Sequence, residues 1–94
     1  MPPKLLSEEE ISRRLPEIPN WARAGKEIKR ELRFKGFLES MAFVNKVAAL
    51  SEAMDHHPDI LIQWNRVSLM LTTHIARGLT DMDFVLAKRI EGAV

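Results

Sequence analysis

The sequence predicts an α+β fold: a single domain of order α-β-β-α-β-β-α, in which a four-stranded, mostly antiparallel sheet has helices packed on one face. Apolar and polar residues alternate in two stretches, 21–34 and 60–72, and apolar residues recur every three or four positions in the stretches around them. Each alternating stretch contains a turn signal, so each is expected to form a hairpin that helices cover on one side. The chain of 94 residues suffices for one core, and we assign 1–94 to one domain.

The first two elements are a short helix and a hairpin. Ser7 and Glu10 have the spacing of a capping box, and Pro16 ends the helix that follows them. Trp21, which we expect in the core, opens the hairpin, and the chain is predicted to turn at 24–26. The alternation indicates one wet sheet face, and we expect the basic residues of the hairpin there, namely Lys26, Lys29, Arg30, Arg33 and Lys35.

A longer helix follows Gly36. Its apolar residues fall three or four positions apart and are expected to form the buried face: Phe37, Met41, Val44, Ala48 and Ser51, widened by Leu38, Val47, Leu50 and Met54. The helix has to end before His57, because the residue before a proline is disfavoured in helical geometry. His56 and His57 are therefore expected in the loop just past its C-terminus.

The second hairpin and a terminal helix complete the chain. The pattern predicts a tight turn at Asn65-Arg66 and places His74 at the far end of the second strand. Thr80 and Asp83 have the spacing of a capping box, which predicts the start of the last helix.

The composition excludes several classes of protein. With 46% hydrophobic and 29% charged residues it is that of an ordinary soluble domain, and no apolar run approaches the roughly 20 residues of a membrane span. The N-terminus lacks the pattern of a secretion signal, so we expect a cytoplasmic protein with no membrane contact. Because the chain has no cysteine, disulfides, zinc–thiolate sites and thiol nucleophiles are excluded. The net charge of +1 gives no reason to expect direct binding of nucleic acid.

The predicted sheet has an exposed edge and one open face. An exposed strand edge can pair with another chain, and small domains often complete a core or a sheet in this way. We therefore expect a homo-oligomer, either a dimer or a tetramer.

All three histidines, His56, His57 and His74, lie in the window 52–83. A hairpin brings its two ends together, so the loop before its first strand and the end of its second strand are predicted to lie side by side. The three imidazoles can then converge on one pocket. Two kinds of chemistry remain open, a three-histidine zinc site and metal-free acid–base catalysis. The adjacency of two histidines and the lack of a helical pair at i and i+4 favour the metal-free alternative.

Three other residues of the window are candidates for supporting roles. Glu52 lies one helical turn before His56, where a carboxylate can orient an imidazole, although a solvated surface glutamate explains it equally well. Asp83 is already explained as the acidic partner of the Thr80 capping box. Trp64 is expected in the core or in the pocket wall, because its indole offers only one donor for chemistry.

The residues of this window have the spacing of a known family. Glu52, His56-His57-Pro58, Trp64, His74 and Asp83 resemble the motif of the pterin-4a-carbinolamine dehydratase family. The resemblance extends over nearly the whole chain; it includes Asn20-Trp21, Phe34-Lys35-Gly36-Phe37, Thr73-His74 and Gly78-Leu79-Thr80.

The resemblance implies dehydration of 4a-hydroxytetrahydrobiopterin to quinonoid dihydrobiopterin and water in tetrahydrobiopterin recycling, with no metal and no organic cofactor. By position it implies that His56, His57 and His74 are catalytic and contact the pterin; we expect His56 and His74 to transfer protons and His57 to orient the ring. Pocket lining is expected from Pro58 and from the backbone around Thr73, Ile75 and Ala76. Since some family members are dimerisation partners of a transcription factor, the alternatives are a protein-interaction module and a dehydratase acting on a different pterin.

Overall fold

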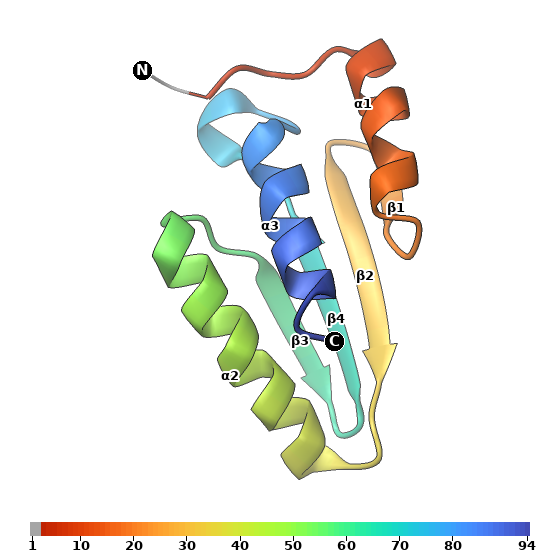
Figure 1. The fold of residues 1–94 in the computed structure, drawn as a ribbon, viewed down its shortest axis with the longest axis vertical. Helices are drawn as coiled ribbons and strands as arrows, with labels where there is room; N and C mark the ends of the chain where they lie inside the picture. The colour runs from red at the N-terminus through yellow and green to blue at the C-terminus, as the bar shows by residue number, and fades with distance from the viewer. Residues whose placement is uncertain (1–2) are drawn as a thin grey trace.

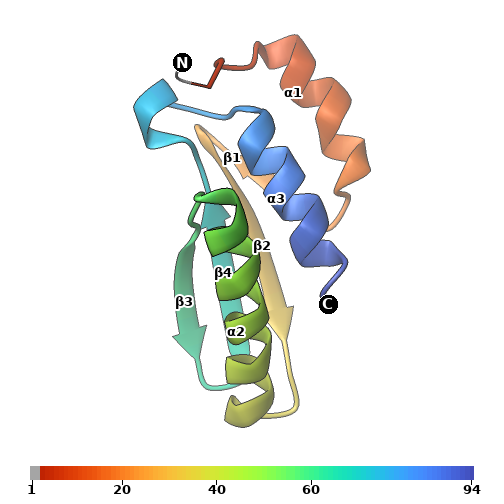
Figure 2. The same cartoon turned by 60° about the vertical axis from the view of Figure 1, so that its left-hand side comes forward.

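The computed structural model describes residues 3–94, and its elements follow the predicted order (Figure 1). They are α1 (Glu8–Arg14), the 3-10 turn η1 (Leu15–Glu17), β1 (Ala22–Ala24), β2 (Glu27–Arg33), α2 (Phe37–Met54), β3 (Asp59–Gln63), β4 (Arg66–Leu71), the 3-10 turn η2 (His74–Ala76) and α3 (Asp81–Glu91). The strands form one antiparallel sheet in the order β1-β2-β4-β3. Helices α2 and α3 lie on the same face of this sheet in both views (Figure 1 and Figure 2), so the predicted α+β architecture is confirmed.

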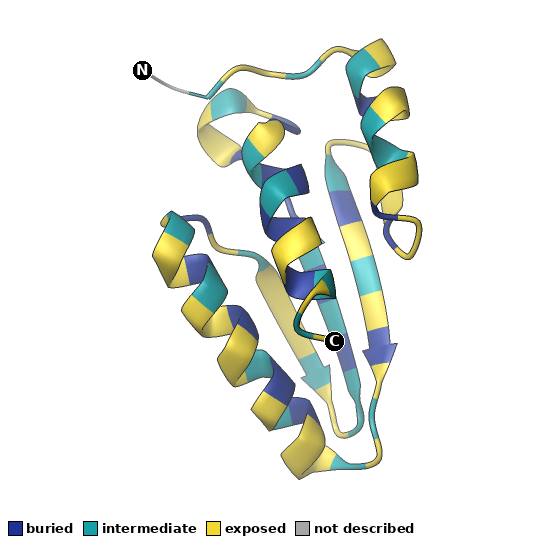
Figure 3. Cartoon of the chain, in the orientation of Figure 1, coloured by how far each residue is buried: buried dark blue, intermediate teal, exposed yellow. Residues whose placement is uncertain are grey.

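The core lies between the sheet and these helices. Strand register places Ile28 opposite Leu71 and Leu32 opposite Val67, so the apolar residues of β2 and β4 share the face that the helices cover. Figure 3 shows the resulting alternation of buried and exposed positions along β2. Fifteen buried apolar side chains form one cluster: Ile11, Ile18, Trp21, Ile28, Leu32, Phe43, Val47, Val67, Leu69, Leu71, Leu79, Phe84, Leu86, Ala87 and Ile90. Both capping boxes, at Ser7 and at Thr80, are present as predicted.

The buried face of α2 agrees with the predicted one only in part: Val47 and Ser51 are buried as expected, whereas Ser40 and Phe43 were not expected there. Phe37 and Leu38, expected in the core, are 50% and 80% exposed, and the fully buried positions are Ser40, Phe43, Val47 and Ser51. Two of these are serines, whose hydroxyls donate to carbonyls one turn earlier in the helix, Ser51 to Val47 at 2.7 Å and Ser40 to Gly36 at 3.0 Å. Because these hydroxyls are satisfied within the helix, small polar residues can be buried at low cost. A prediction based on apolar residues alone therefore included the exposed Phe37 and Leu38 in the buried face and missed Ser40.

The turn of the second hairpin lies one residue earlier than predicted. Gln63 pairs with Arg66, so the two turn residues are Trp64 and Asn65 rather than Asn65 and Arg66. Trp64 has a φ of 53° and its side chain is 65% exposed. The prediction that Trp64 belongs to the core or the pocket wall is wrong, because the alternating pattern ends at Gln63 and the tryptophan belongs to the turn.

One arginine of the basic strand lies on the covered face of the sheet. Arg30 pairs with Leu69 in register, and its Nε donates to Glu91 Oε1 of α3 at 2.7 Å. The same carboxylate oxygen accepts from Trp21 Nε1 at 2.8 Å. Trp21 is buried as predicted, but Arg30 is not part of the wet face, because Glu91 provides a partner for its charge on the helix side.

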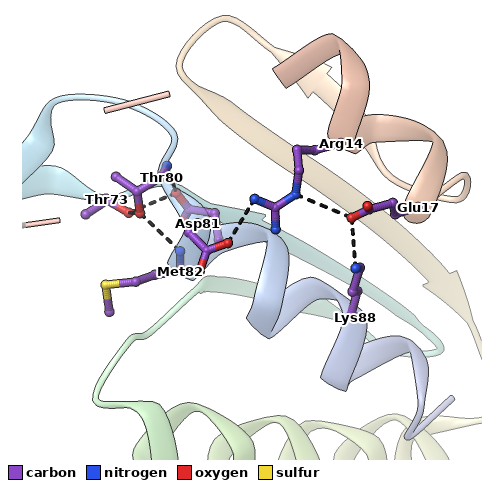
Figure 4. Close-up of polar contacts among 8 residues, drawn as sticks. Arg14, Glu17, Thr73, Thr80, Asp81, Met82 and Lys88 are labelled. Atoms are coloured by element: carbon purple, nitrogen blue, oxygen red, sulfur yellow. Dashed lines mark hydrogen bonds and ion pairs between the residues drawn. The ribbon is translucent and has the colours of Figure 1, made fainter. Parts of the chain in front are cut away.

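Polar contacts also attach α1 to α3 (Figure 4). Arg14 at the end of α1 lies 2.8 Å from Asp81, and its guanidinium carbon lies 5.0 Å from the centre of the Phe84 ring. Glu17 accepts from Lys88 at 2.8 Å, and this hydrogen bond, with a weaker one from Arg14, holds the pKa of Glu17 below its ordinary value. Within residues 3–94, none of the helices is long and apolar enough to cross a membrane.

Candidate functional site

The end of α2 sets the position of the first two histidines. Asp55 follows the last helical residue in the left-handed conformation, with φ 50° and ψ 43°. The backbone N–H of His56 then donates to the carbonyl of Ser51 at 3.1 Å, as in the turn that commonly terminates helices. Pro58 follows His57 and prevents the helix from continuing. The predicted end of the helix is confirmed, and His56 leaves it turned into the protein, where it is buried.

His56 is held by the carboxylate of Asp83. Its Nε2 lies 2.6 Å from Asp83 Oδ1, and Asp83 is fully buried at the start of α3. The other carboxylate oxygen, Oδ2, accepts from the Thr73 hydroxyl at 2.8 Å and from the Thr80 backbone N–H at 2.9 Å. Asp83 therefore has the predicted role in the capping box and, in addition, contacts a histidine that is 27 residues away along the chain.

These contacts define the protonation of the neutral His56 ring. An ionised carboxylate can only accept hydrogen bonds, so in this contact the His56 proton resides on Nε2. A neutral imidazole carries one proton, which leaves Nδ1 of His56 with a lone pair available to a ligand. The sequence pattern identified both residues but not this pairing.

Two threonine hydroxyls orient the carboxylate from behind. Thr73 Oγ1 and Thr80 Oγ1 lie 2.8 Å apart (Figure 4), and each hydroxyl has one hydrogen to donate. Since Thr73 donates its hydrogen to Asp83, Thr80 has to donate to Thr73. Thr80 Oγ1 in turn accepts from the backbone N–H of Met82 at 3.3 Å. Every donor in this buried series of hydrogen bonds has a defined acceptor, which restricts the Asp83 carboxylate to one orientation.

Glu52 contacts His57 and not His56. The Nε2 of His57 lies 2.5 Å from Glu52 Oε2, and both side chains are more than half exposed. Each of the two adjacent histidines is thus held through its Nε2. The carboxylate that contacts His56 is buried, and the one that contacts His57 lies at the surface. Of the two alternatives left open for Glu52, contact with an imidazole is the one present, but the partner is His57, because the turn at Asp55 directs His56 inward and leaves His57 beside the last turn of α2.

His74 lies on η2, three residues beyond the end of β4, and not at the strand end as predicted. The chain leaves the strand, makes an isolated bridge between Thr73 and Gly78, and encloses η2 between them. His74 is exposed, and no hydrogen bond of its ring is present within residues 3–94. This region lies at the same end of the sheet as the C-terminus of α2 in Figure 1 and Figure 2.

All three histidines line one hollow of about 270 Å³. The predicted hairpin placed them side by side, and the structure brings them together. Of the other expected lining residues, Thr73 and Ile75 contribute, whereas Pro58 and Ala76 are not part of the wall. The wall also includes four residues that the sequence did not single out, Pro3, Asp55, Thr72 and Met82. Only Asp55 had a usable signal, because aspartate tolerates the left-handed conformation that ends a helix.

The arrangement is suited to moving protons. A buried imidazole with a carboxylate on one nitrogen and a free lone pair on the other can accept a proton, and the carboxylate stabilises the imidazolium that forms. His74, across the same hollow, is exposed and can exchange protons with water. In the described part of the chain, no group of three histidine, aspartate or glutamate side chains is arranged to hold a metal ion.

Comparison with known proteins identifies the family of the chain. Residues 4–93 match the family model described as pterin 4 alpha carbinolamine dehydratase. Proteins from Sulfolobus acidocaldarius and Thermomicrobium roseum, provisionally named pterin-4-alpha-carbinolamine dehydratases, are 47% and 51% identical over 85 residues each. These alignments cover 90% of this chain, with 93% of the first relative and 91% of the second.

Two solved structures share the fold. The transcriptional coactivator/pterin dehydratase from Brucella melitensis superposes with a TM-score of 0.91 at 29% identity, over 96% of this chain and 98% of its own. A pterin dehydratase-like protein identified as a RuBisCO assembly factor in the alpha-carboxysome superposes with a TM-score of 0.68 at 25% identity, over 79% and 88%. The extent of the family match and the identity to these relatives show that the chain belongs to the pterin 4 alpha carbinolamine dehydratase family.

Proposed function

We propose that the protein dehydrates 4a-hydroxytetrahydrobiopterin to quinonoid dihydrobiopterin and water, by histidine acid–base catalysis, in the recycling of tetrahydrobiopterin. The observation that supports this most directly is the hollow lined by His56, His57 and His74, in which a buried carboxylate holds one imidazole. Membership of the family supports the reaction class. The reaction requires the loss of a proton from N5 and the departure of the 4a-hydroxyl as water, and both steps are within the reach of imidazoles.

In the proposed mechanism His56 is the base and His74 is the acid. Nδ1 of His56 takes the proton from N5 while the N5–C4a double bond forms, and Asp83 stabilises the resulting imidazolium. Protonated His74 gives a proton to the 4a-hydroxyl as the C4a–O bond breaks, and water leaves. The net change is the transfer of one proton from N5 to the departing hydroxyl. Before the next turnover water returns a proton to exposed His74, and water in the vacated hollow takes the proton from Nδ1 of His56, so both histidines regain their starting states.

His57 and the wall of the hollow have positioning roles in this proposal. His57 is held by Glu52 at the surface, so it can present its second ring nitrogen to a polar edge of the pterin. The apolar side chains of Ile75 and Met82 line the same hollow and can contact the flat ring.

Stopped-flow absorbance tests the proposal. Freshly generated 4a-hydroxytetrahydrobiopterin is mixed with buffer, with the protein, or with the His74→Ala variant, all in the presence of a chelator. We expect the protein to accelerate the decay and the variant to lose most of the acceleration, by about 10²-fold or more. Lys46→Ala, on the exposed face of α2, is the control and should behave as the wild type. No acceleration by folded protein would contradict the proposal, and activity that returns only with added zinc would contradict its metal-free mechanism.

A second candidate function is that of a protein-interaction module. Three large apolar side chains, Phe37, Leu38 and Trp64, are at least half exposed. They belong to the start of α2 and to the β3–β4 turn, which lie together at the end of the molecule away from η2 in Figure 1 and Figure 2. If binding to a protein were the only function, His74→Ala would leave the biological activity unchanged; loss of that activity would exclude a purely binding role.

We also propose that the chain forms a homo-oligomer, either a dimer or a tetramer, through its open sheet edge. Within residues 3–94, β3 pairs with β4 on one side only, and Figure 3 shows most of β3 exposed. Ile60 and Leu61 of this strand are 37% and 49% exposed. Edge pairing with a second copy would satisfy the backbone groups of β3 and cover these side chains.

A further inference from the structure

A second hollow adjoins the histidine hollow. Its volume is about 450 Å³, and two of its wall residues, Thr72 and His74, also line the histidine hollow. The remaining wall comes from the β1–β2 turn and from the end of η2: Ala24, Lys26, Glu27 and Arg77. A ligand whose ring lies among the histidines can therefore extend a substituent past His74 into this space.

The charged side chains of the second hollow are mainly cationic. Lys26 and Arg77 are exposed, and within residues 3–94 neither lies within 4 Å of a carboxylate oxygen. Glu27 is the acidic residue of the wall, and its carboxylate lies 3.5 Å from Lys29 on the same strand. Two cations without an acidic partner thus remain beside the histidines, whereas nearby Arg23 is paired with Glu8.

Both cations are attached to the shared wall through their backbones. The carbonyl oxygen of Lys26 accepts from the Thr72 hydroxyl at 2.6 Å, which fixes the β1–β2 turn against the wall. The backbone N–H of Arg77 donates to the carbonyl of His74 at 3.0 Å. Arg77 also has a φ of 61°. This left-handed conformation costs free energy for an arginine but not for a glycine. The backbones of the two cationic residues are thereby fixed beside the wall that both hollows share.

The size of the histidine hollow also favours a ligand that extends into the second hollow. At about 270 Å³ it lies just below the usual range of ligand sites, about 300–1,000 Å³, so a ring with a long substituent would use additional room. The second hollow supplies that room, and lysine and arginine are the side chains that bind phosphate groups through charge-assisted hydrogen bonds.

We propose that the second hollow binds a phosphate group carried on the side chain of the pterin, with Lys26 and Arg77 as its ligands. This inference rests on the proposed function, because it places the pterin ring among the histidines. It goes beyond that function by adding a preference for pterins whose side chain ends in a phosphate ester.

Titration calorimetry with two matched pterins tests the inference. The probes are 7,8-dihydroneopterin and its monophosphate ester, which differ only in the phosphate. We expect the ester to bind about tenfold more tightly at low salt, through two exposed charge contacts, and to lose this advantage as salt is added. The double variant Lys26→Met/Arg77→Met should bind both pterins with the affinity of wild type for the unphosphorylated one. The double variant Lys35→Met/Lys46→Met removes two charges outside both hollows and should retain the preference.

The possible outcomes separate this inference from the proposed function. Equal affinity for the two pterins, in a protein that binds both, would overturn the phosphate site and leave the proposed function standing. If neither pterin binds, the phosphate site is overturned, and the stopped-flow assay decides the proposed function separately. Inorganic phosphate serves as a competitor: if it binds as tightly as the ester does, the hollow is a site for free anions and the inference is wrong.

Discussion

Replacement of Asp83 by asparagine tests the proposed role of His56 most directly. The two side chains have nearly the same shape, but the amide has one acceptor oxygen and one NH₂ group where the carboxylate has two acceptors. The Thr73 hydroxyl and the Thr80 N–H both donate to Oδ2, so the amide oxygen is expected at that position. The NH₂ group then faces Nε2 of His56 and can only donate to it. His56 is therefore expected to take the other tautomer, with its proton on Nδ1.

The size of the effect follows from this change of tautomer. The proposed base loses the lone pair that faces the ligand, while the wall of the hollow remains in place. A positioned proton-transfer group contributes about 10²- to 10⁴-fold to a rate. The corresponding substitution in the serine-protease triad lowers kcat about 10⁴-fold through the wrong tautomer. We expect Asp83→Asn to lower kcat by about 10²- to 10⁴-fold and to change KM by less than about threefold.

Two measurements check this expectation. The stopped-flow assay gives kcat and KM, and long-range ¹H–¹⁵N correlation spectra show which nitrogen of His56 carries the proton. Asp81→Asn is the matched control, since it makes the same chemical change two residues earlier, at an exposed side chain that pairs with Arg14. Asp83→Ala is less informative, because it leaves three buried donors without an acceptor. Full activity of Asp83→Asn, or a proton that stays on Nε2, would refute the assigned tautomer and the role built on it.

Three further predictions concern stability and assembly. Glu91→Ala removes the shared acceptor of Arg30 and Trp21, and we expect a loss of about 2 kcal/mol in the free energy of unfolding by urea, with a smaller loss for Glu91→Gln; equal losses would contradict this explanation. The pKa of Glu17 is lowered in the folded protein, so its contribution is present above its ordinary value of 4.5 and is lost as the pH falls through the lower folded value. The melting temperature should therefore drop less on acidification in Glu17→Gln than in wild type. An equal drop in the two proteins would contradict this expectation. Light scattering should show an oligomer of wild type and a smaller species of Leu61→Lys; a wild-type monomer would exclude pairing through β3.

The sequence predicted those features of the fold and site that depend on neighbours in the chain. The end of α2 follows from Pro58, and the start of α3 follows from the spacing of Thr80 and Asp83, so both were found. The buried face of α2 was found in part: Val47 and Ser51 are buried as predicted, but Ser40 was missed because hydropathy ranks serine as polar. The displaced position of Trp64 has a similar origin, since a period of two does not mark where a strand gives way to its turn.

The pairings at the site depend on distance in space and could not be read from spacing. The contact of His56 with Asp83 joins the end of one helix to the start of another, and the sequence suggested Glu52 as the nearer carboxylate. A change of backbone direction at a single residue, Asp55, decided which histidine turned inward and which acid it met. The three histidines were nevertheless located correctly as a group, because a hairpin places its two ends together whatever the details of its loops.

The use of one carboxylate both as a helix cap and as the partner of His56 has a consequence for heat inactivation. Helix ends open more readily than helix centres, and opening of the first turn of α3 would release Asp83 from the Thr80 N–H and from His56 together. Catalysis is then expected to fail at temperatures at which the sheet and most of the helical signal are still intact. In a thermal series, the decline of activity should coincide with the loss of protection of the first amides of α3 from hydrogen exchange, ahead of global melting. The active molecules would accordingly be those in which the first turn of α3 is intact.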